Sequence, residues 1–539
     1  MTDPCLCNDG NGSLKVPGFS DVPLDLEIYP QNRFTHGSTE WVQWPNLTAR
    51  ELAMLGLMND LTEEHGWHKS IFDDNLMVDW RMQALSRPLI SPKAWDWCLA
   101  ELQDKALYFE QTGNIVVFNT GAGIVKSDAV AEMIQTELRD AAKLLEADEK
   151  APRQQVVLNL ILIKQNCGRT PIRIRTYGVE PDNERPKWAT WDNPRKLESD
   201  RSNTAFKEAV DEIKEYLALP EKLEEREGDQ ISPTWETENG GLSKALYTKW
   251  KRLRTWRHPE PGTAFSFDDW KAGRAGKTII DRKIDDPDFN TCHNFYKVAL
   301  QDSFRKKGLQ VVVKISSVEL TPEDSAYGGT DWHLDGMLND HIVASALYVF
   351  DVKNVTEARL SFRQQTRMEQ AEFHYSKHEM ERLMEVFAIP GDEEDMDDFV
   401  MFDFPPSLQD LGSVVAPQGR LLVWPNVLHH RMEPIQLLDP TVSGHCKFIS
   451  LHLVDPHYRI CSTRNVPPQR HDWWVEEAIE ATGAAKHRLP PELIYQIDAE
   501  TGDWPMGIEE AERVRLEREQ EQNTVDEFIM RRGAHRYIF

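Results

Sequence analysis

The chain has 539 residues, of which 40% are hydrophobic and 9% aromatic, a composition that fits a globular protein longer than most single domains. Its formal net charge of −27 repels phosphate backbones, so we expect no nucleic acid among its partners. No run of about eighteen apolar residues occurs, which argues against a membrane span. The seven cysteines are odd in number and widely spaced, and no signal peptide is evident, so we expect a reducing compartment, by default the cytoplasm.

The first half of the chain divides into two regions. Residues 1–150 begin with a Gly-, Pro- and Asn-rich stretch and continue with apolar residues at helical spacing, which predicts an N-terminal arm and a helical region. Residues 151–307 predict a mixed α/β region packed on the core. Its predicted pieces are strands at 155–163 and 171–177, a helix at 205–217 and a charged loop at 219–230.

The second half changes character at residue 308. Short strand-like runs broken by turns fill 308–465, which predicts a barrel or jelly roll, with a helical insertion near 366–398 that ends in an acidic, solvated loop. Residues 466–539 return to a helical pattern. We expect these helices to pack on the outside of the core or on a second subunit, so a homodimer is one of the alternatives. The predicted fold class is α+β, a double-stranded β-helix (jelly-roll) core with large N-terminal and C-terminal helical surrounds.

The most informative motif is His333-Leu334-Asp335. A His-x-acid pattern occurs twice, and such short motifs also arise by chance. The flanking sequence therefore has to decide which of the two matches is a candidate metal site. His258-Pro259-Glu260 lies in a proline-bracketed turn, whereas His333 lies between strand-like runs at 309–315 and 342–350. Strand side chains alternate, so His333 and Asp335 would share one face and could bind one metal ion. An ordinary hydrogen-bonding surface pair is the alternative.

Two adjacent histidines, His429 and His430, offer a third ligand. They follow a buried strand with a proline stop at 419–425 and open another strand-like run at 431–437. Adjacent strand residues face opposite sides, so only one imidazole points inward. We choose His430, because double-stranded β-helix oxygenases often have a proline and an aliphatic residue after this ligand. His429 would then be outward or a hydrogen-bond donor behind the ligands, and two strand histidines without a metal are the alternative.

Two histidines and one carboxylate form a facial triad, which suits ferrous iron and leaves three cis positions for a cosubstrate and dioxygen. Oxygenases that this pattern resembles anchor the distal carboxylate of 2-oxoglutarate with a basic residue, because a carboxylate needs a charged hydrogen-bonding partner. On that resemblance we expect Lys447 in this role, with Arg363 and Arg459 as alternatives. A solvent-facing Lys447 is the opposing interpretation.

Longer phrases extend the resemblance over most of the chain. They lie at 48–55, 332–341, 419–422, 453–457, 462–463 and 465–469. With these phrases the chain resembles a large fungal family, the domain-of-unknown-function 4246 family, whose members look like Fe(II)/2-oxoglutarate oxygenases. In one respect the chain departs from related oxygenases. Their Gly-x-Arg/Lys step supplies the cosubstrate anchor where this chain has Cys446, which cannot bind a carboxylate in that way.

The resemblance implies a non-haem iron 2-oxoglutarate-dependent dioxygenase. His333, Asp335 and His430 would hold Fe(II), with 2-oxoglutarate and O2 as cosubstrates. The substrate would be a small metabolite, such as an amino acid or an intermediate of secondary metabolism, whose unactivated C–H bond is hydroxylated, desaturated or closed into a ring. Candidates for lining the substrate pocket, or for structural roles, are Tyr327, Trp332 and Asn339. A non-catalytic jelly-roll interaction module and a protein side-chain hydroxylase stay open as alternatives.

Overall fold

The computed structural model of the chain describes Phe34, residues 47–118, 123–146, 156–160, 260–262, 266–268, 300–305, 308–337, 340–365, 387–388 and 408–457, with single positions and short pieces between 460 and 524. The predictions for 171–177, 205–217 and 219–230, and most of those for 366–398 and 466–539, lie outside these residues. Within the described ranges, no helix combines the length and the apolar character that crossing a bilayer requires.

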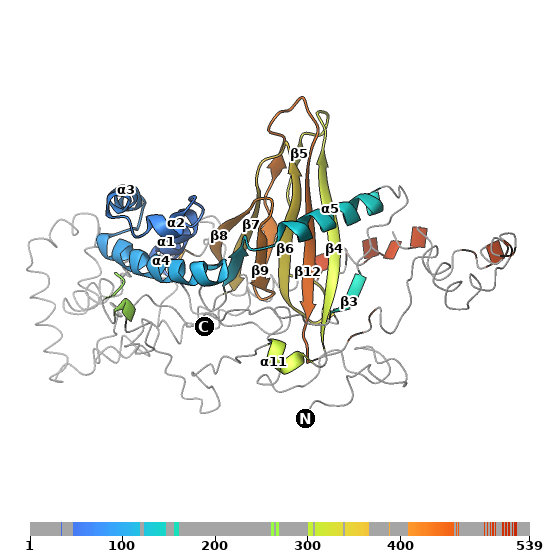
Figure 1. Ribbon diagram of the computed structural model, residues 1–539, viewed down its shortest axis with the longest axis horizontal. Coiled ribbons are helices and arrows are strands. Elements are labelled where there is room, and N and C mark those ends of the chain that lie inside the picture. The colour runs from blue at the N-terminus through green and yellow to red at the C-terminus, as the bar shows by residue number, and fades with distance from the viewer. Residues whose placement is uncertain are drawn as a thin grey trace, which may run out of the picture.

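Most of the described residues between 49 and 146 are helical, but two strands that the helical spacing did not predict lie among them, at 114–117 and 124–127 (Figure 1). The first helix, α1 (Ala49–Leu61), begins with a capping box, in which the side chains of Thr48 and Glu51 each accept a hydrogen bond from the other's backbone N–H. The other helices are α2 (Trp67–Ser70), α3 (Asp74–Leu85), α4 (Pro92–Thr112), α5 (Glu132–Glu146) and the short α11 (Leu300–Phe304). The N-cap of α4 is Ser91, whose hydroxyl accepts from the backbone N–H of Ala94.

A seven-stranded antiparallel sheet forms the centre of the structure. Its strands lie side by side in the order β1 (Asn114–Val117), β2 (Ile124–Ser127), β9 (Leu421–Pro425), β6 (Ile342–Lys353), β12 (Gly444–Val454), β4 (Leu309–Leu320) and β3 (Val156–Leu160). Strand β12, between β6 and β4, has the longest pairings, in which Leu453 lies opposite Val311 of β4 and Ala344 of β6. Strands that are neighbours in this sheet are therefore often more than a hundred residues apart in sequence.

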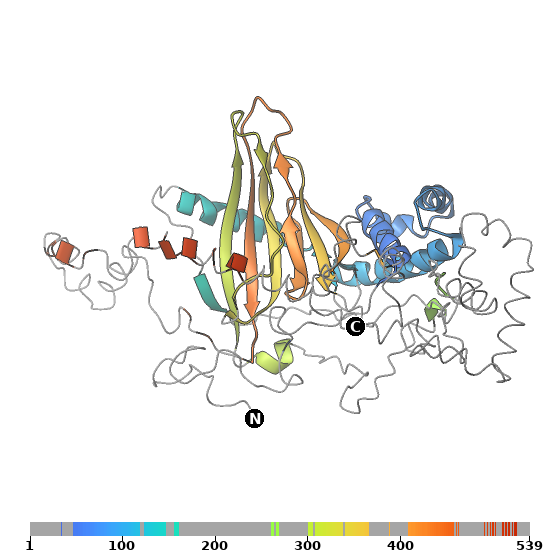
Figure 2. The ribbon, with the colours of Figure 1, turned by 180° about the vertical axis from the view of Figure 1, so that it is seen from behind.

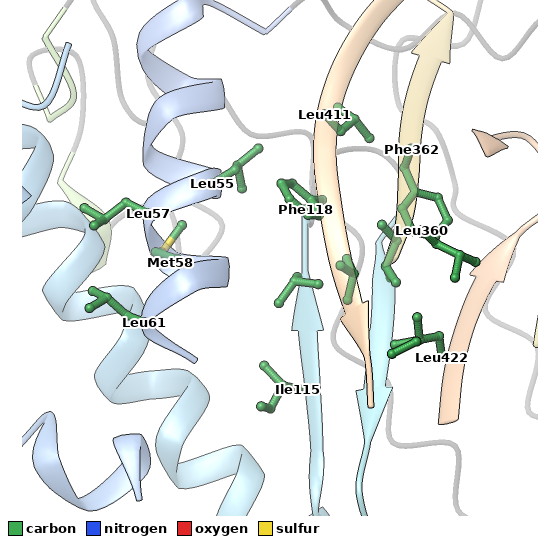
Figure 3. Close-up of a cluster of buried hydrophobic side chains, with 14 of the residues drawn as sticks. Leu55, Leu57, Met58, Leu61, Ile115, Phe118, Leu360, Phe362, Leu411 and Leu422 are labelled. Atoms are coloured by element: carbon green, nitrogen blue, oxygen red, sulfur yellow. The ribbon is translucent and has the colours of Figure 1, made fainter. Parts of the chain in front are cut away.

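Two smaller antiparallel sheets complete the strands. One has the order β10 (His429–Met432), β7 (Ala358–Gln365) and β8 (Leu408–Ala416), and the other pairs β11 (Ile435–Gln436) with β5 (Ala326–Tyr327). A single hydrophobic core contains Leu360 and Phe362 of β7, Leu422 of β9 and Leu55 of α1, so the sheets and α1 pack together (Figure 3). The mixed helix-and-sheet fold is confirmed, but the described strands form separate sheets and not one closed barrel.

The large sheet has two different faces. In Figure 1, α5 crosses the front of the sheet, and Figure 2 shows the sheet from behind. The side chains of Gln135 and Arg139 donate hydrogen bonds to the Phe350 carbonyl at 3.0 and 2.9 Å. Apolar side chains on this α5 face are Ala142 of the helix with Tyr348, Phe350 and Ile449 of the sheet. The opposite face packs against the three-stranded sheet through the main core.

A buried charged network joins the helices to the large sheet. Lys126 of β2 is 1% exposed, and its ammonium donates to Glu63 at 2.5 Å and to Thr62 at 2.8 Å. Arg420, just before β9, donates to the same Glu63 at 2.5 Å and makes two hydrogen bonds to Asp128 at 2.8 and 3.0 Å. Burial lowers the pKa of Lys126 to about 8, although the charge of Glu63 opposes this shift. Both cations depend on the Glu63 carboxylate.

Arg420→Met should lower the free energy of unfolding by about 2–3 kcal/mol, because it removes a buried guanidinium from the half-buried Glu63 and leaves Lys126 as the remaining cation of the network. Urea denaturation measures this loss. The matched control is Arg87→Met, which removes an exposed pair with Asp60 at 2.7 Å and should cost less than about 1 kcal/mol. Equal losses in the two variants would show that the Arg420 network contributes no more than an ordinary surface ion pair.

Candidate metal centre

Two backbone hydrogen bonds bring His333 and His430 together. The N–H of each residue donates to the carbonyl of the other at 3.1 Å, so the pair forms an isolated antiparallel bridge. Residues directly opposite each other in such a bridge point to the same face. Their imidazole ring centroids are accordingly 4.4 Å apart. His430 is also a residue of β10, which holds it against β7.

Asp335 lies two residues after His333, in a bend outside the named strands, and its carboxylate reaches the same side as the two imidazoles. The chain turns sharply after it. Gly336 has a φ of 77°, and a Cβ at this position would lie 2.7 Å from the Ile342 side chain. The turn is closed by the Asp340 carboxylate, which accepts a hydrogen bond from the Met337 N–H at 2.9 Å. The glycine of the His-x-Asp-Gly phrase therefore has a backbone role.

The three predicted ligands converge. One ligand atom from each of His333, Asp335 and His430 lies within 4.8 Å of the other two. The His333 Nε2 is 4.0 Å from one Asp335 oxygen, and the His430 Nε2 is 3.6 Å from the other. The His333 Nδ1 donates to the Asp331 carbonyl at 2.8 Å, which leaves the Nε2 lone pair available to a metal. Two imidazoles and one carboxylate suit a divalent transition metal, so the donor set fits such an ion.

The charge states of the triad also suit metal binding. Burial lowers the pKa of His430 to about 3 against the attraction of Asp335, so its imidazole is neutral near pH 7. Burial alone would raise the pKa of Asp335, but the imidazoles of His452, His430 and His333 hold it well below its ordinary value. Neutral imidazoles and ionised carboxylates are the forms that bind metal ions.

Three polar residues that the sequence analysis did not select surround Asp335. They are Ser345 of β6, Asn426 in the turn after β9 and His452 of β12. The strand register brings them together, since Ser345 lies opposite Trp424 on one side and His452 on the other. Their only sequence signal is a polar residue among apolar neighbours, and that pattern does not say which distant segment it meets.

His429 points to the other face of β10. It lies opposite Arg363 of β7, whose guanidinium is 3.4 Å from the His429 Nδ1, and the Gln365 amide nitrogen is 3.4 Å from its Nε2. Burial and the charge of Arg363 lower the pKa of His429 to about 3. Trp332 shares this face, with the guanidinium carbons of Arg363 and Arg431 at 4.4 and 4.7 Å from its ring centroid. Arg363 and Trp332 therefore belong to a cluster separate from the triad.

Lys447 lies on the α5 face of the large sheet. Ile449, two residues further along β12, packs in the α5 cluster, and alternation puts Lys447 beside it. The Lys447 ammonium is 4.0 Å from Glu319. His452 contacts Asp335 from the opposite face. This placement separates Lys447 from the triad and argues against it as the cosubstrate anchor.

A different basic residue, Lys314 of β4, shares the triad face. It lies directly opposite Ser450, which precedes His452 by two residues, so all three side chains point to one side. The Lys314 side chain is exposed, and no ion pair to it is found within the described residues. Among the remaining predicted residues, Tyr327 packs on the main core opposite Ile435, whereas Asn339 and Arg459 lie outside the described residues.

Gly336→Ala should be more destabilising than Gly419→Ala. Both glycines have a positive φ, 77° and 91°, so both alanines carry backbone strain of about 1–2 kcal/mol. Of the two, only the Cβ at position 336 would meet other side chains, Ile342 at 2.7 Å and Asp340 at 3.3 Å, and overpacking adds about 1–3 kcal/mol. Urea denaturation of the metal-free proteins measures the difference. If the two variants lose equal stability, Ile342 accommodates the methyl group and Gly336 is not sterically required.

Comparisons with known proteins connect the chain to a family without an assigned activity. The family described as "Protein of unknown function (DUF4246)" matches residues 92–164 and 156–477, and "Domain of unknown function DUF4246, N-terminal" matches residues 16–83. No curated protein matches significantly. A crystal structure of a bsmA homologue from Methylobium petroleophilum PM1 is similar over 27% of this chain and 41% of that chain, with 14% identity and a TM-score of 0.15, a likeness too low to bear on function.

Proposed function

The chain belongs to the DUF4246 family, and we propose that it is a fungal non-haem Fe(II)/2-oxoglutarate-dependent oxygenase. The convergence of His333, Asp335 and His430 is the observation that carries the proposal. When bound, iron supplies the oxidation of an unactivated C–H bond by O2, coupled to the decarboxylation of 2-oxoglutarate to succinate and CO2.

A double-stranded β-helix core is part of the proposal. The chain passes repeatedly between the large sheet and the smaller sheets, from β4 to β5, from β6 to β7 and β8, from β9 to β10 and β11, and back to β12. Such alternation between two layers is the pattern of a jelly roll. His430 comes from a small-sheet strand, whereas Ser345 and His452 come from the large sheet, so the triad lies where the two layers meet.

Apolar rings shield one side of the triad from water. The centroid of the Trp424 ring is 4.8 Å from that of the His430 imidazole, and that of the Phe362 ring is 6.3 Å away. Both aromatic side chains are buried in the main core. These apolar side chains exclude water from one side of the ligands. The low local polarity keeps His430 neutral and strengthens the electrostatic attraction between the triad and a cation.

Lys314 replaces Lys447 as the proposed partner of the cosubstrate carboxylate. It is a diagonal neighbour of His452 across the β4–β12 pair, and such neighbours are roughly 7–8 Å apart. The flexible lysine side chain can extend from there along the triad face, and a charged hydrogen bond to a carboxylate is one of the stronger polar contacts in a protein. Lys314 of β4 would thus supply the positive charge that Cys446 of the neighbouring strand β12 cannot.

The proposed substrate is a small metabolite, such as an amino acid or an intermediate of secondary metabolism. The net charge of −27 disfavours polyanionic substrates. A few local cations can still bind a small anion in a protein of this net charge. Hydroxylation, desaturation and ring closure all begin with removal of a hydrogen atom from the same C–H bond, so the position of the bound substrate decides among them.

Anaerobic addition of Fe(II) and 2-oxoglutarate should produce the weak visible absorption band of the metal–cosubstrate chelate. His430→Ala should abolish the band, because it removes a ligand of the triad. The matched control is His429→Ala, which alters the opposite face of the same strand and should retain the band. A folded wild-type protein without the band would instead favour a non-catalytic interaction module, and loss of the band only in His429→Ala would exchange the roles of the two histidines.

Lys314→Met should raise the dissociation constant of 2-oxoglutarate by about tenfold to a hundredfold, because it removes a charge-assisted hydrogen bond. Titration of the anaerobic Fe(II) protein with 2-oxoglutarate, followed by the same band, measures this constant. Lys447→Met is the control, since it removes an equal charge from the α5 face. An unchanged constant in Lys314→Met, or a larger effect of Lys447→Met, would contradict the assignment of Lys314.

A further inference from the structure

We infer that Asn426, Ser345 and His452 are positioning residues that hold Asp335 ready for metal binding. The inference rests on the proposed metal centre and goes beyond it, because none of the three residues is a ligand. The three ligand atoms that lie within 4.8 Å of one another belong to His333, Asp335 and His430. Among the described residues, the contacts of His452 at the site are with Asp335 and Ser345.

Asn426 holds the backbone of Asp335 from both sides. Its side-chain oxygen accepts a hydrogen bond from the Asp335 N–H at 2.9 Å, and its amide nitrogen donates to the Asp335 carbonyl at 2.7 Å. The same nitrogen donates to the Ile342 carbonyl at 3.0 Å, and the Asn426 N–H donates to the Val343 carbonyl at 2.9 Å. Asn426 is 1% exposed, so these bonds are sheltered from water. It thereby fixes the loop that carries Asp335 to the first residues of β6.

Ser345 and His452 hold the Asp335 carboxylate itself. The Ser345 hydroxyl donates to the Asp335 Oδ2 at 2.5 Å, and the His452 Nδ1 lies 3.0 Å from that hydroxyl and 3.4 Å from the same oxygen. Ser345 is 1% exposed. A hydroxyl and an imidazole on adjacent strands therefore restrict rotation of the carboxylate from one side.

These contacts hold a loop residue that sheet pairing does not fix. His430 is fixed by sheet pairing, but Asp335 lies outside the named strands. Without its polar neighbours, its carboxylate would lose rotational freedom only when the metal binds, and this loss would weaken binding. Groups that orient metal ligands in this way typically contribute 10–100-fold to metal affinity.

The test uses Co(II) alone as the probe, with its ligand-field absorption and a competing chelator to give the dissociation constant. Ser345→Ala should weaken Co(II) binding by about 10–100-fold, whereas Ser345→Thr, which keeps the hydroxyl, should bind nearly as well as the wild type. The control is Ser361→Ala, which removes a buried hydroxyl bonded to Glu433 away from the triad and should leave the constant unchanged. Thermal unfolding of the metal-free proteins separates weaker binding from lost folding.

A second pair of variants keeps the inference falsifiable if Ser345→Ala does not fold. His452→Leu should weaken Co(II) binding, and His452→Asn, which retains a polar nitrogen near the position of Nδ1, should restore part of it. Unchanged Co(II) affinity in folded Ser345→Ala or in folded His452→Leu would overturn the positioning role. Failure of the folded wild-type protein to bind Co(II) at all would instead refute the metal centre on which the inference rests.

Discussion

The antiparallel bridge between His333 and His430 is the contact on which the site depends. A slip of one residue in either segment would turn an imidazole to the wrong face, because strand side chains alternate. The register is also held nearby, where the Thr330 N–H donates to the Met432 carbonyl at 3.0 Å and the Met432 N–H donates to the Thr330 hydroxyl at 2.9 Å. Gly329 allows this approach, since a Cβ there would lie 2.5 Å from the Met432 carbonyl oxygen.

The two faces of β10 show how neighbours give different chemistry to the same residue type. Burial holds both His429 and His430 neutral, with the pKa of each near 3. His430 faces the ionised Asp335, so together they form an electron-rich pair that can accept a cation. His429 faces the guanidinium of Arg363 instead, and a cation there would be repelled. Alternation along one short strand thus separates a site suited to a metal from a cluster that excludes one.

Several of the phrases on which the predicted resemblance rested maintain the architecture around the site. Glu51 in the phrase at 48–55 closes the capping box of α1, and burial raises its pKa to about 7. Arg420 in the phrase at 419–422 ties β9 to the helices through Glu63. Asp455 in the phrase at 453–457 accepts a hydrogen bond from the Phe34 N–H at 3.1 Å. Arg420 and Asp455 connect distant parts of the chain, whereas Glu51 closes a local cap. The phrase at 332–341 contains two of the three candidate ligands.

The sequence by itself determined what depends on near neighbours. The two-residue spacing predicted that His333 and Asp335 would lie on one side, alternation along a strand separated His429 from His430, and helical spacing identified the N-terminal helices. Only the tertiary structure decided which distant strands pair, because pairing depends on register and shared core packing that no local pattern encodes. It alone placed Lys447 on the α5 face, Lys314 on the triad face, and Ser345, Asn426 and His452 around Asp335.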